Sequence, residues 1–110
     1  MLKVEGRIWM ETASGVPIGA GRITLLEKIL EKGSITVAAK EMKMSYRQAW
    51  EQVDSMNKMN SKPLVVRVAG GKGGGGTIVT KEGKKIIDAY NELLKKFNSF
   101  KKQETKDIKI

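Results

Sequence analysis

The fold of this chain is decided by GSITVAAKEMKMSYRQAWEQVDSMNKMN, residues 33–60, and by KPLVVRVAGGKGGGGTIVT, residues 62–80. The apolar spacing of the first stretch predicts two helices joined by a tight turn. The alternation in the second predicts a β-hairpin whose tip is rich in glycine. Two helices followed by such a two-stranded wing can hold one helix in a DNA groove and a loop beside it.

The two helices have clear start signals. Ser34 precedes a helix predicted over residues 35–42, and Ser45 precedes one predicted over residues 46–60. A serine hydroxyl at such a position accepts a hydrogen bond from a backbone N–H of the first turn. We expect the second helix to bury Ala49, Trp50, Val53 and Met56, with Tyr46 and Met59 extending this face.

The opposite face of that helix offers groups that suit DNA. Ser45, Arg47 and Gln48 lie in or next to its first turn, and these residue types read base edges and phosphates. An ordinary amphipathic helix with a polar outside is the alternative at this point. With the flanking elements included, the predicted DNA-binding residues are Ser34, Ser45, Tyr46, Arg47, Gln48, Gln52, Arg67, Lys72, Gly73 and Gly74.

The hairpin tip, residues 70–76, contains six glycines and Lys72. Its backbone can therefore approach a partner closely, and Lys72 supplies a charge for phosphate. A nucleotide-binding P-loop would need Ser or Thr after the lysine at a helix start, whereas Gly73 and then a strand follow here. The tip is either a wing against the DNA backbone or minor groove, or a flexible hairpin end.

Composition narrows the function classes. The chain has neither cysteine nor histidine, which removes the thiol nucleophile and the commonest general base and metal ligand. We therefore expect no enzyme, no metal and no cofactor. The net charge of +9 favours a polyanionic partner, nucleic acid first and an anionic membrane second; together with the helix-turn-helix pattern it predicts double-stranded DNA as the partner. Neither a membrane-length apolar run nor a signal peptide pattern is seen, so we expect a cytoplasmic protein without a membrane partner.

The residues before residue 33 are predicted to form elements that pack against the helix-turn-helix and its wing. Residues 2–11 alternate as a half-buried strand, with Trp9 on the polar face, and residues 16–18 can return as a second strand. Trp9 is either covered by another element or partner, or exposed alone. Residues 22–32 predict a helix that buries Ile23, Leu26, Ile29 and Leu30, with Leu25 at the edge of the stripe.

A last helix is predicted over residues 81–100, after Thr80 as its cap. Its apolar stripe is longer than one small core needs, so we expect a homodimer with a paired helix. The predicted dimer residues are Trp9, Tyr90, Leu94, Phe97 and Phe100; a dimer made by the leading strand and Trp9 is the alternative. Residues 1–100 are predicted as one domain, and residues 101–110 as a charged, frayed tail.

Residues 33–57 together with PLVVRVAGGKGGGGTIVTKEGKKII, residues 63–87, resemble the N-terminal winged helix-turn-helix domain of the ModE family of molybdate-responsive transcription regulators. That domain is related to the LysR-type DNA-binding domain. The resemblance covers about residues 22–97. It implies an α+β winged helix-turn-helix fold with an N-terminal strand or hairpin and a long C-terminal helix.

The resemblance also implies a dimeric, sequence-specific DNA-binding regulator, with its recognition helix at residues 45–60 and its wing at residues 67–77. A non-specific DNA-binding or partner-recruiting module is the alternative function. Full-length members carry C-terminal oxyanion-binding domains. Since no residue here matches that module, an oxyanion effector is not expected.

Overall fold

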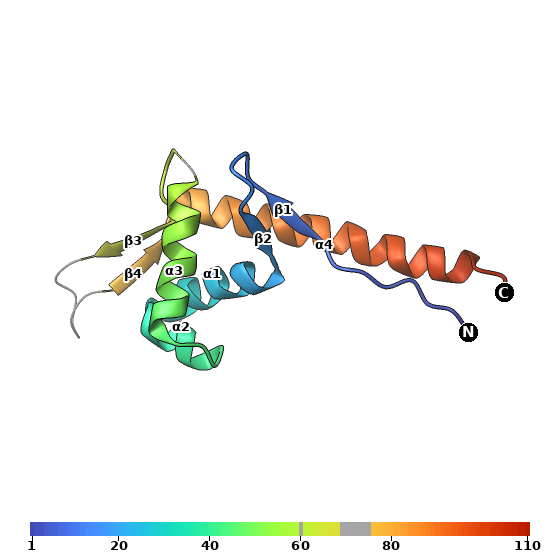
Figure 1. Ribbon diagram of the computed structural model, residues 1–110, viewed down its shortest axis with the longest axis horizontal. Helices are drawn as coiled ribbons and strands as arrows, with labels where there is room; N and C mark the ends of the chain where they lie inside the picture. Colours follow the sequence, from blue (N-terminus) through green and yellow to red (C-terminus); the bar gives the residue numbers. More distant parts are fainter. Residues whose placement is uncertain (60, 69–75) are drawn as a thin grey trace.

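The computed structural model describes residues 1–59, 61–68 and 76–110. Two antiparallel strand pairs, β1–β2 and β3–β4, lie at either side of the helix-turn-helix unit (Figure 1). In chain order the elements are β1 (Trp9–Glu11), β2 (Pro17–Gly19), α1 (Ala20–Lys32), α2 (Ile35–Glu41), α3 (Tyr46–Lys58), β3 (Val65–Val68), β4 (Gly76–Val79) and α4 (Lys81–Asp107). The predicted α+β winged helix-turn-helix class is confirmed.

The predicted caps begin three of the helices. The Ser34 hydroxyl accepts from the Val37 amide at 3.1 Å, and the Ser45 hydroxyl accepts from the Gln48 amide at 3.0 Å. Thr80 does the same for α4, accepting from the Gly83 amide at 3.1 Å. Each cap satisfies an N–H that the helix itself cannot pair.

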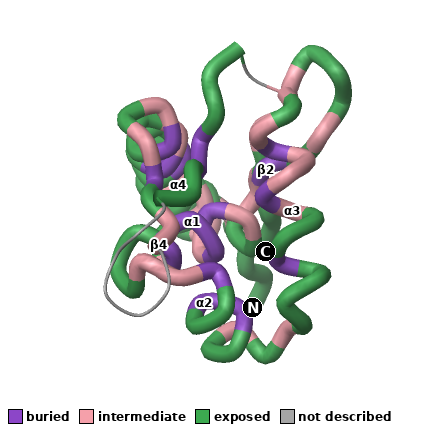
Figure 2. Tube along the Cα trace, turned by 90° about the vertical axis from the view of Figure 1, so that its left-hand side faces the viewer, coloured by how far each residue is buried: buried purple, intermediate pink, exposed green. Residues whose placement is uncertain are grey.

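The core forms where α2, α3, β4 and α4 surround α1, and its buried residues gather there (Figure 2). Two predictions for α1 are wrong. Leu25 is fully buried instead of lying at an edge, and Leu30 is exposed. The reason is that α1 packs against α2, β4 and α4 on several sides, so its buried face is turned from the predicted stripe. The largest buried side chains of α1 are Ile23, Leu25, Leu26 and Ile29.

Two predictions for the inner face of α3 are also wrong, because Trp50 and Tyr46 are exposed; Trp50 keeps 39% of its surface. Ala49, Val53 and Met56 are buried as predicted. Successive residues of a helix are about 100° apart, so Trp50 lies a quarter turn away from Ala49. Because of this rotation the Trp50 side chain points towards β3 and away from the core.

Gly33 connects the end of α1 to β4. It adopts φ 66°, the left-handed conformation that glycine reaches without strain, and its N–H donates to the Ile29 carbonyl at 2.8 Å. Its own carbonyl accepts from the Thr77 amide at 3.0 Å. One residue thus ends the helix and attaches the wing strand to it.

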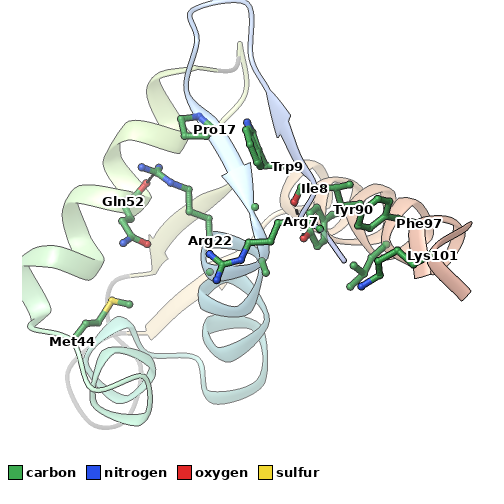
Figure 3. A pocket seen from close by; sticks show the side chains of 15 residues that line it. Arg7, Ile8, Trp9, Pro17, Arg22, Met44, Gln52, Tyr90, Phe97 and Lys101 are labelled. Carbon is green, nitrogen blue, oxygen red and sulfur yellow. Dashed lines mark hydrogen bonds between the residues drawn. The ribbon is translucent and has the colours of Figure 1, made fainter. Parts of the chain in front are cut away.

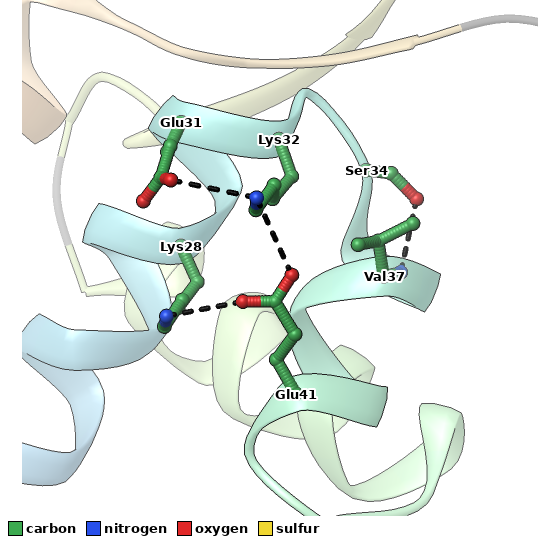
Figure 4. A network of polar contacts seen from close by, with 6 residues as sticks. All are labelled: Lys28, Glu31, Lys32, Ser34, Val37 and Glu41. Atoms are coloured by element: carbon green, nitrogen blue, oxygen red, sulfur yellow. Dashed lines mark hydrogen bonds and ion pairs between the residues drawn. The ribbon is translucent and has the colours of Figure 1, made fainter.

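A charged cluster joins α1 to α2 on the surface. Glu41 lies 3.0 Å from the Lys28 ammonium and 3.6 Å from that of Lys32 (Figure 4). The hydrogen bond from Lys28 lowers the pKa of the Glu41 carboxyl below its ordinary value, and the same bond raises the pKa of Lys28. These exposed contacts orient the two helices but contribute little stability.

The N-terminal segment, residues 1–8, differs from prediction because it lies along α4 instead of forming most of a long strand (Figure 1). The Val4 amide donates to the Thr105 hydroxyl at 2.8 Å, and the Tyr90 hydroxyl donates to the Ile8 carbonyl at 3.1 Å. Glu5 lies 3.6 Å from the Lys101 ammonium.

The C-terminal helix is longer than predicted. It ends at Asp107 rather than near residue 100, so most of the segment predicted as a frayed tail is helical. The contacts of the N-terminal segment with this part of α4 account for the extra turns. Among the residues that the structure describes, no helix is long and apolar enough to cross a membrane.

Candidate nucleic-acid interface

The outer face of α3 presents the predicted DNA-reading residues at its start. Arg47 and Gln48 are exposed, and the Arg47 side chain keeps 88% of its accessible surface. The Arg47 Nε lies 3.1 Å from a carboxylate oxygen of Glu51, one turn along. This contact holds the side chain along the helix and leaves both terminal nitrogens of the guanidinium for a partner.

The hydroxyl oxygen of each capping serine accepts a backbone hydrogen bond, but its O–H can still donate. The Ser34 and Ser45 oxygens accept from amides of their own helices. A hydroxyl can donate while it accepts, so each O–H remains available to a phosphate oxygen. Both predicted positions therefore remain compatible with a DNA contact.

Gln52 lies apart from Arg47, on the other flank of α3. It lines a cavity of about 550 Å³ between the β1–β2 hairpin, the start of α1, α3 and α4 (Figure 3). There the Arg22 guanidinium donates to the Gln52 backbone carbonyl at 3.4 Å and to the Ser55 hydroxyl at 2.6 Å. The structure thus separates Gln52 from the other predicted residues of this helix.

The wing strands bring Arg67 to the start of α3. Val65 pairs with Val79 and Arg67 pairs with Thr77, so these four residues share one face of the β3–β4 ladder. On that face the Arg67 guanidinium donates to the Tyr46 hydroxyl. Arg67 therefore joins the wing strand to the first residue of α3, on the exposed side of both. The opposite face of the ladder carries the exposed Val66, Val68 and Ile78.

Asn57 is a positioning residue that sequence reasoning missed. Its amide oxygen accepts from the Leu64 and Val65 amides at 2.8 and 3.1 Å, and its amide nitrogen donates to the Val65 carbonyl at 2.9 Å. Asn57 thereby fixes β3 against α3, which sets the angle between wing and helix. A polar amide shortly before Pro63 was the available signal, because its carbonyl oxygen and its NH2 group can pair with backbone N–H and C=O groups at the same time.

The remaining predicted DNA contacts, Lys72, Gly73 and Gly74, lie outside the described residues.

The predicted dimer residues fall into three groups. Tyr90 is only 2% exposed and its hydroxyl is bonded to Ile8, so it has almost no surface for a partner. Leu94 and Phe97 are half-buried beneath the N-terminal segment, where Gly6 lies against the Phe97 ring. Trp9 and Phe100 are exposed by 57% and 54%.

The two predicted dimer surfaces turn out to be one. Trp9 and Leu93 line the same hollow of about 350 Å³ between the N-terminal segment and α4, with Phe97 in its wall. The Phe97 and Phe100 rings are stacked, with their centroids 6.4 Å apart. The leading segment and the C-terminal helix therefore contribute to a single apolar face.

Comparisons with curated proteins show relatives whose names mention molybdenum transport or transcriptional regulation. The chain is 46% identical over 87 residues to the molybdenum transport protein ModE of Azotobacter vinelandii, which is 79% of this chain and 32% of that protein. It is 43% identical over 72 residues to the DNA-binding transcriptional dual regulator ModE of Escherichia coli K12, which is 66% of this chain and 28% of that protein. The chain thus spans under a third of the length of these relatives.

Among solved structures, the BenM DNA-binding domain in complex with catB site 1 DNA has a TM-score of 0.57 at 16% identity. The match covers 78% of this chain and 90% of that one. ArgP from Mycobacterium tuberculosis also has a TM-score of 0.57 at 16% identity, covering 77% of this chain and 30% of that one. At such low identity these structures show that the fold is shared.

The family described as "Bacterial regulatory helix-turn-helix protein, lysR family" matches residues 21–84, more than half of the chain. That range includes α2, α3 and both wing strands. The relatives confirm the resemblance to ModE-type regulators. The chain belongs to the lysR family of bacterial regulatory helix-turn-helix proteins.

Proposed function

We propose that this chain is a sequence-specific, DNA-binding transcriptional regulator whose helix α3 enters the major groove. One observation carries the proposal: α3 exposes Arg47 and Gln48 in its first turn, and the wing strand is joined to that same turn through Arg67 and Tyr46. A helix with groove-reading groups beside a basic strand is the arrangement that reads bases while gripping the backbone. Family membership supports the same function.

The relatives' names mention molybdenum as well as DNA. Because the matched part is under a third of each relative, only DNA binding is proposed for this chain.

Selection of bound DNA from a random pool tests the proposal. We expect a recovered consensus and a specific affinity at least about 10³-fold above that for random DNA at the same salt. Binding that depends steeply on salt yet yields no consensus would instead identify a non-specific DNA-binding module.

Arg47→Ala is expected to weaken binding to the selected sequence by about 1–3 kcal/mol and to relax the preference at one base position, since a bidentate contact to a base edge is lost. The measurement is affinity across all single-base variants of the selected site. Lys58→Ala is the matched control, because it removes the same charge from the last turn of the same helix, where Lys58 pairs with Asp54 at 2.9 Å. An unchanged preference at every position in Arg47→Ala would contradict the role of Arg47.

We also propose that the regulator is a homodimer. Readers of two-fold symmetric DNA place their recognition helices about 34 Å apart, one turn of the duplex. The apolar face around Trp9, Leu93 and Phe100 supports pairing, since these side chains are 57%, 44% and 54% exposed in one chain. The C-terminal part of α4 extends away from α2, α3 and the wing strands (Figure 1), so pairing there is compatible with α3 contacting DNA.

A further inference from the structure

A further hollow lies between α3 and β3, on the side that carries Arg47. It measures about 390 Å³ and is lined by Tyr46, Arg47, Trp50, Glu51 and Arg67. It combines an exposed indole and an exposed phenol with two guanidinium groups and one carboxylate. Helical spacing predicts both aromatic rings on the buried face of α3, yet both are exposed. Their exposure here therefore needs another account.

The walls of the hollow are shaped by contacts within the chain. The Arg67 guanidinium donates to the Tyr46 hydroxyl, which holds the phenol at the wing side. The Arg47 Nε is bonded to Glu51 at 3.1 Å, which holds that pair at the outer side. Trp50, one turn after Tyr46, lines the same hollow as the two arginines. The apolar wall is thus bordered by cations, which fits an apolar group attached to a polyanion.

The major groove of DNA supplies such a group at one base. Among the four bases only thymine presents an apolar group to the groove, its 5-methyl, and aromatic or aliphatic side chains contact it. A neighbouring phosphate would face Arg67 at the wing side of the rim, while Arg47 contacts a base edge. A protein partner fits this hollow less well, because it would have to supply carboxylates opposite the arginines as well as an apolar side chain for the hollow.

We propose that Trp50 and Tyr46, held by Arg67, form a binding site for a thymine 5-methyl group and so determine base preference beside the Arg47 contact. This inference rests on the proposed function and deepens it. Trp50 is then a specificity residue that acts through shape and apolar contact, while Arg47 acts through hydrogen bonds.

Replacing thymine by deoxyuracil tests the site, because the substitution removes only the methyl group. Each thymine of the selected sequence is replaced in turn, and affinity is measured for the full chain. We expect one thymine in each half-site whose replacement weakens binding about three- to fivefold, the effect of one methyl-sized group leaving an apolar contact. We expect Trp50→Ala to bind thymine and uracil at that position equally.

Trp9→Ala is the matched control, since Trp9 is also an exposed tryptophan but lies at the start of β1, beside α4. It should retain the preference for thymine over uracil, whatever its overall affinity. The preference is a ratio within one variant, so a change in dimerisation cancels.

A fluorescence measurement reports on Trp50 without altering it. The chain has two tryptophans, so Trp9→Phe leaves Trp50 as the sole indole. Its emission should change on binding the selected DNA. The proposal is overturned if no thymine responds to uracil substitution, if Trp50→Ala keeps the wild-type penalty, or if the emission is unchanged at saturation. In each case a recovered consensus would leave the proposed function standing, whereas failure to select any sequence would refute that function itself.

Discussion

Gly83→Ala lowers the free energy of unfolding by about 2–3 kcal/mol, although alanine is the better helix former. A β-carbon at this position would lie 2.4 Å from the Leu64 carbonyl oxygen and 2.6 Å from a methyl of Val79. The first contact is with backbone, which cannot rotate away. Because Thr80 also bonds to the Leu64 carbonyl through its N–H at 2.9 Å, the strain reaches the junction of β3, β4 and α4.

Chemical denaturation of the wild type and the variant measures this effect. Gly21→Ala is the control, since Gly21 lies in the first turn of α1 and an added β-carbon meets no described atom within 4 Å. It should be neutral or slightly stabilising, by up to about 1 kcal/mol. If Gly83→Ala were as stable as Gly21→Ala, the close approach of α4 to β3 would not exist in solution.

Leu93→Glu combined with Phe100→Glu is expected to convert the proposed dimer into a folded monomer and to weaken binding to a two-fold symmetric site by about 10²-fold or more. Both side chains are exposed in one chain, so the glutamates leave its own core intact. A paired face would have to bury their charges without partners, which is strongly unfavourable. Positions 94 and 97 are poorer choices, because they are half-buried beneath the N-terminal segment.

Sedimentation gives the oligomeric state, and titration with full and half sites gives the affinities. Asn98→Glu with Ser99→Glu adds the same charge to exposed positions elsewhere around α4 and should leave both measurements near wild type. A double variant at positions 93 and 100 that remained a dimer with full-site affinity would place the interface elsewhere.

Much of the fold could be predicted because its signals are local. A hydroxyl before an apolar repeat marks a helix start wherever the rest of the chain lies, so Ser34, Ser45 and Thr80 were identified as caps. Gly33, which directly follows the helix predicted over residues 22–32, ends α1 through a local requirement of the same kind, the left-handed conformation that glycine adopts without strain. The exposed positions of Arg47 and Gln48 also followed from helical spacing alone.

The wrong predictions concern residues whose burial or pairing depends on a neighbour that is distant in the sequence. Periodicity places Trp50 a quarter turn from Ala49 but does not reveal that its neighbour is Arg67 of β3 rather than the core. The close approach at Gly83 and the clamp by Asn57 depend on where β3 lies, which no local pattern states. The alternation of residues 2–11 suggested a sheet, whereas most of this segment packs along α4.

The packing of the N-terminal segment on α4 has a consequence for how the chain matures on the ribosome. Val4 bonds to Thr105 and Ile8 bonds to Tyr90, pairs that are 101 and 82 residues apart. Val4 and Ile8 must therefore wait until Thr105 and Tyr90 have been synthesised, while α2 and α3 can fold against each other once residue 58 has emerged. Closing so long a loop is slow compared with local helix pairing. The apolar face that includes Trp9 is consequently completed last, after the helix-turn-helix unit has formed.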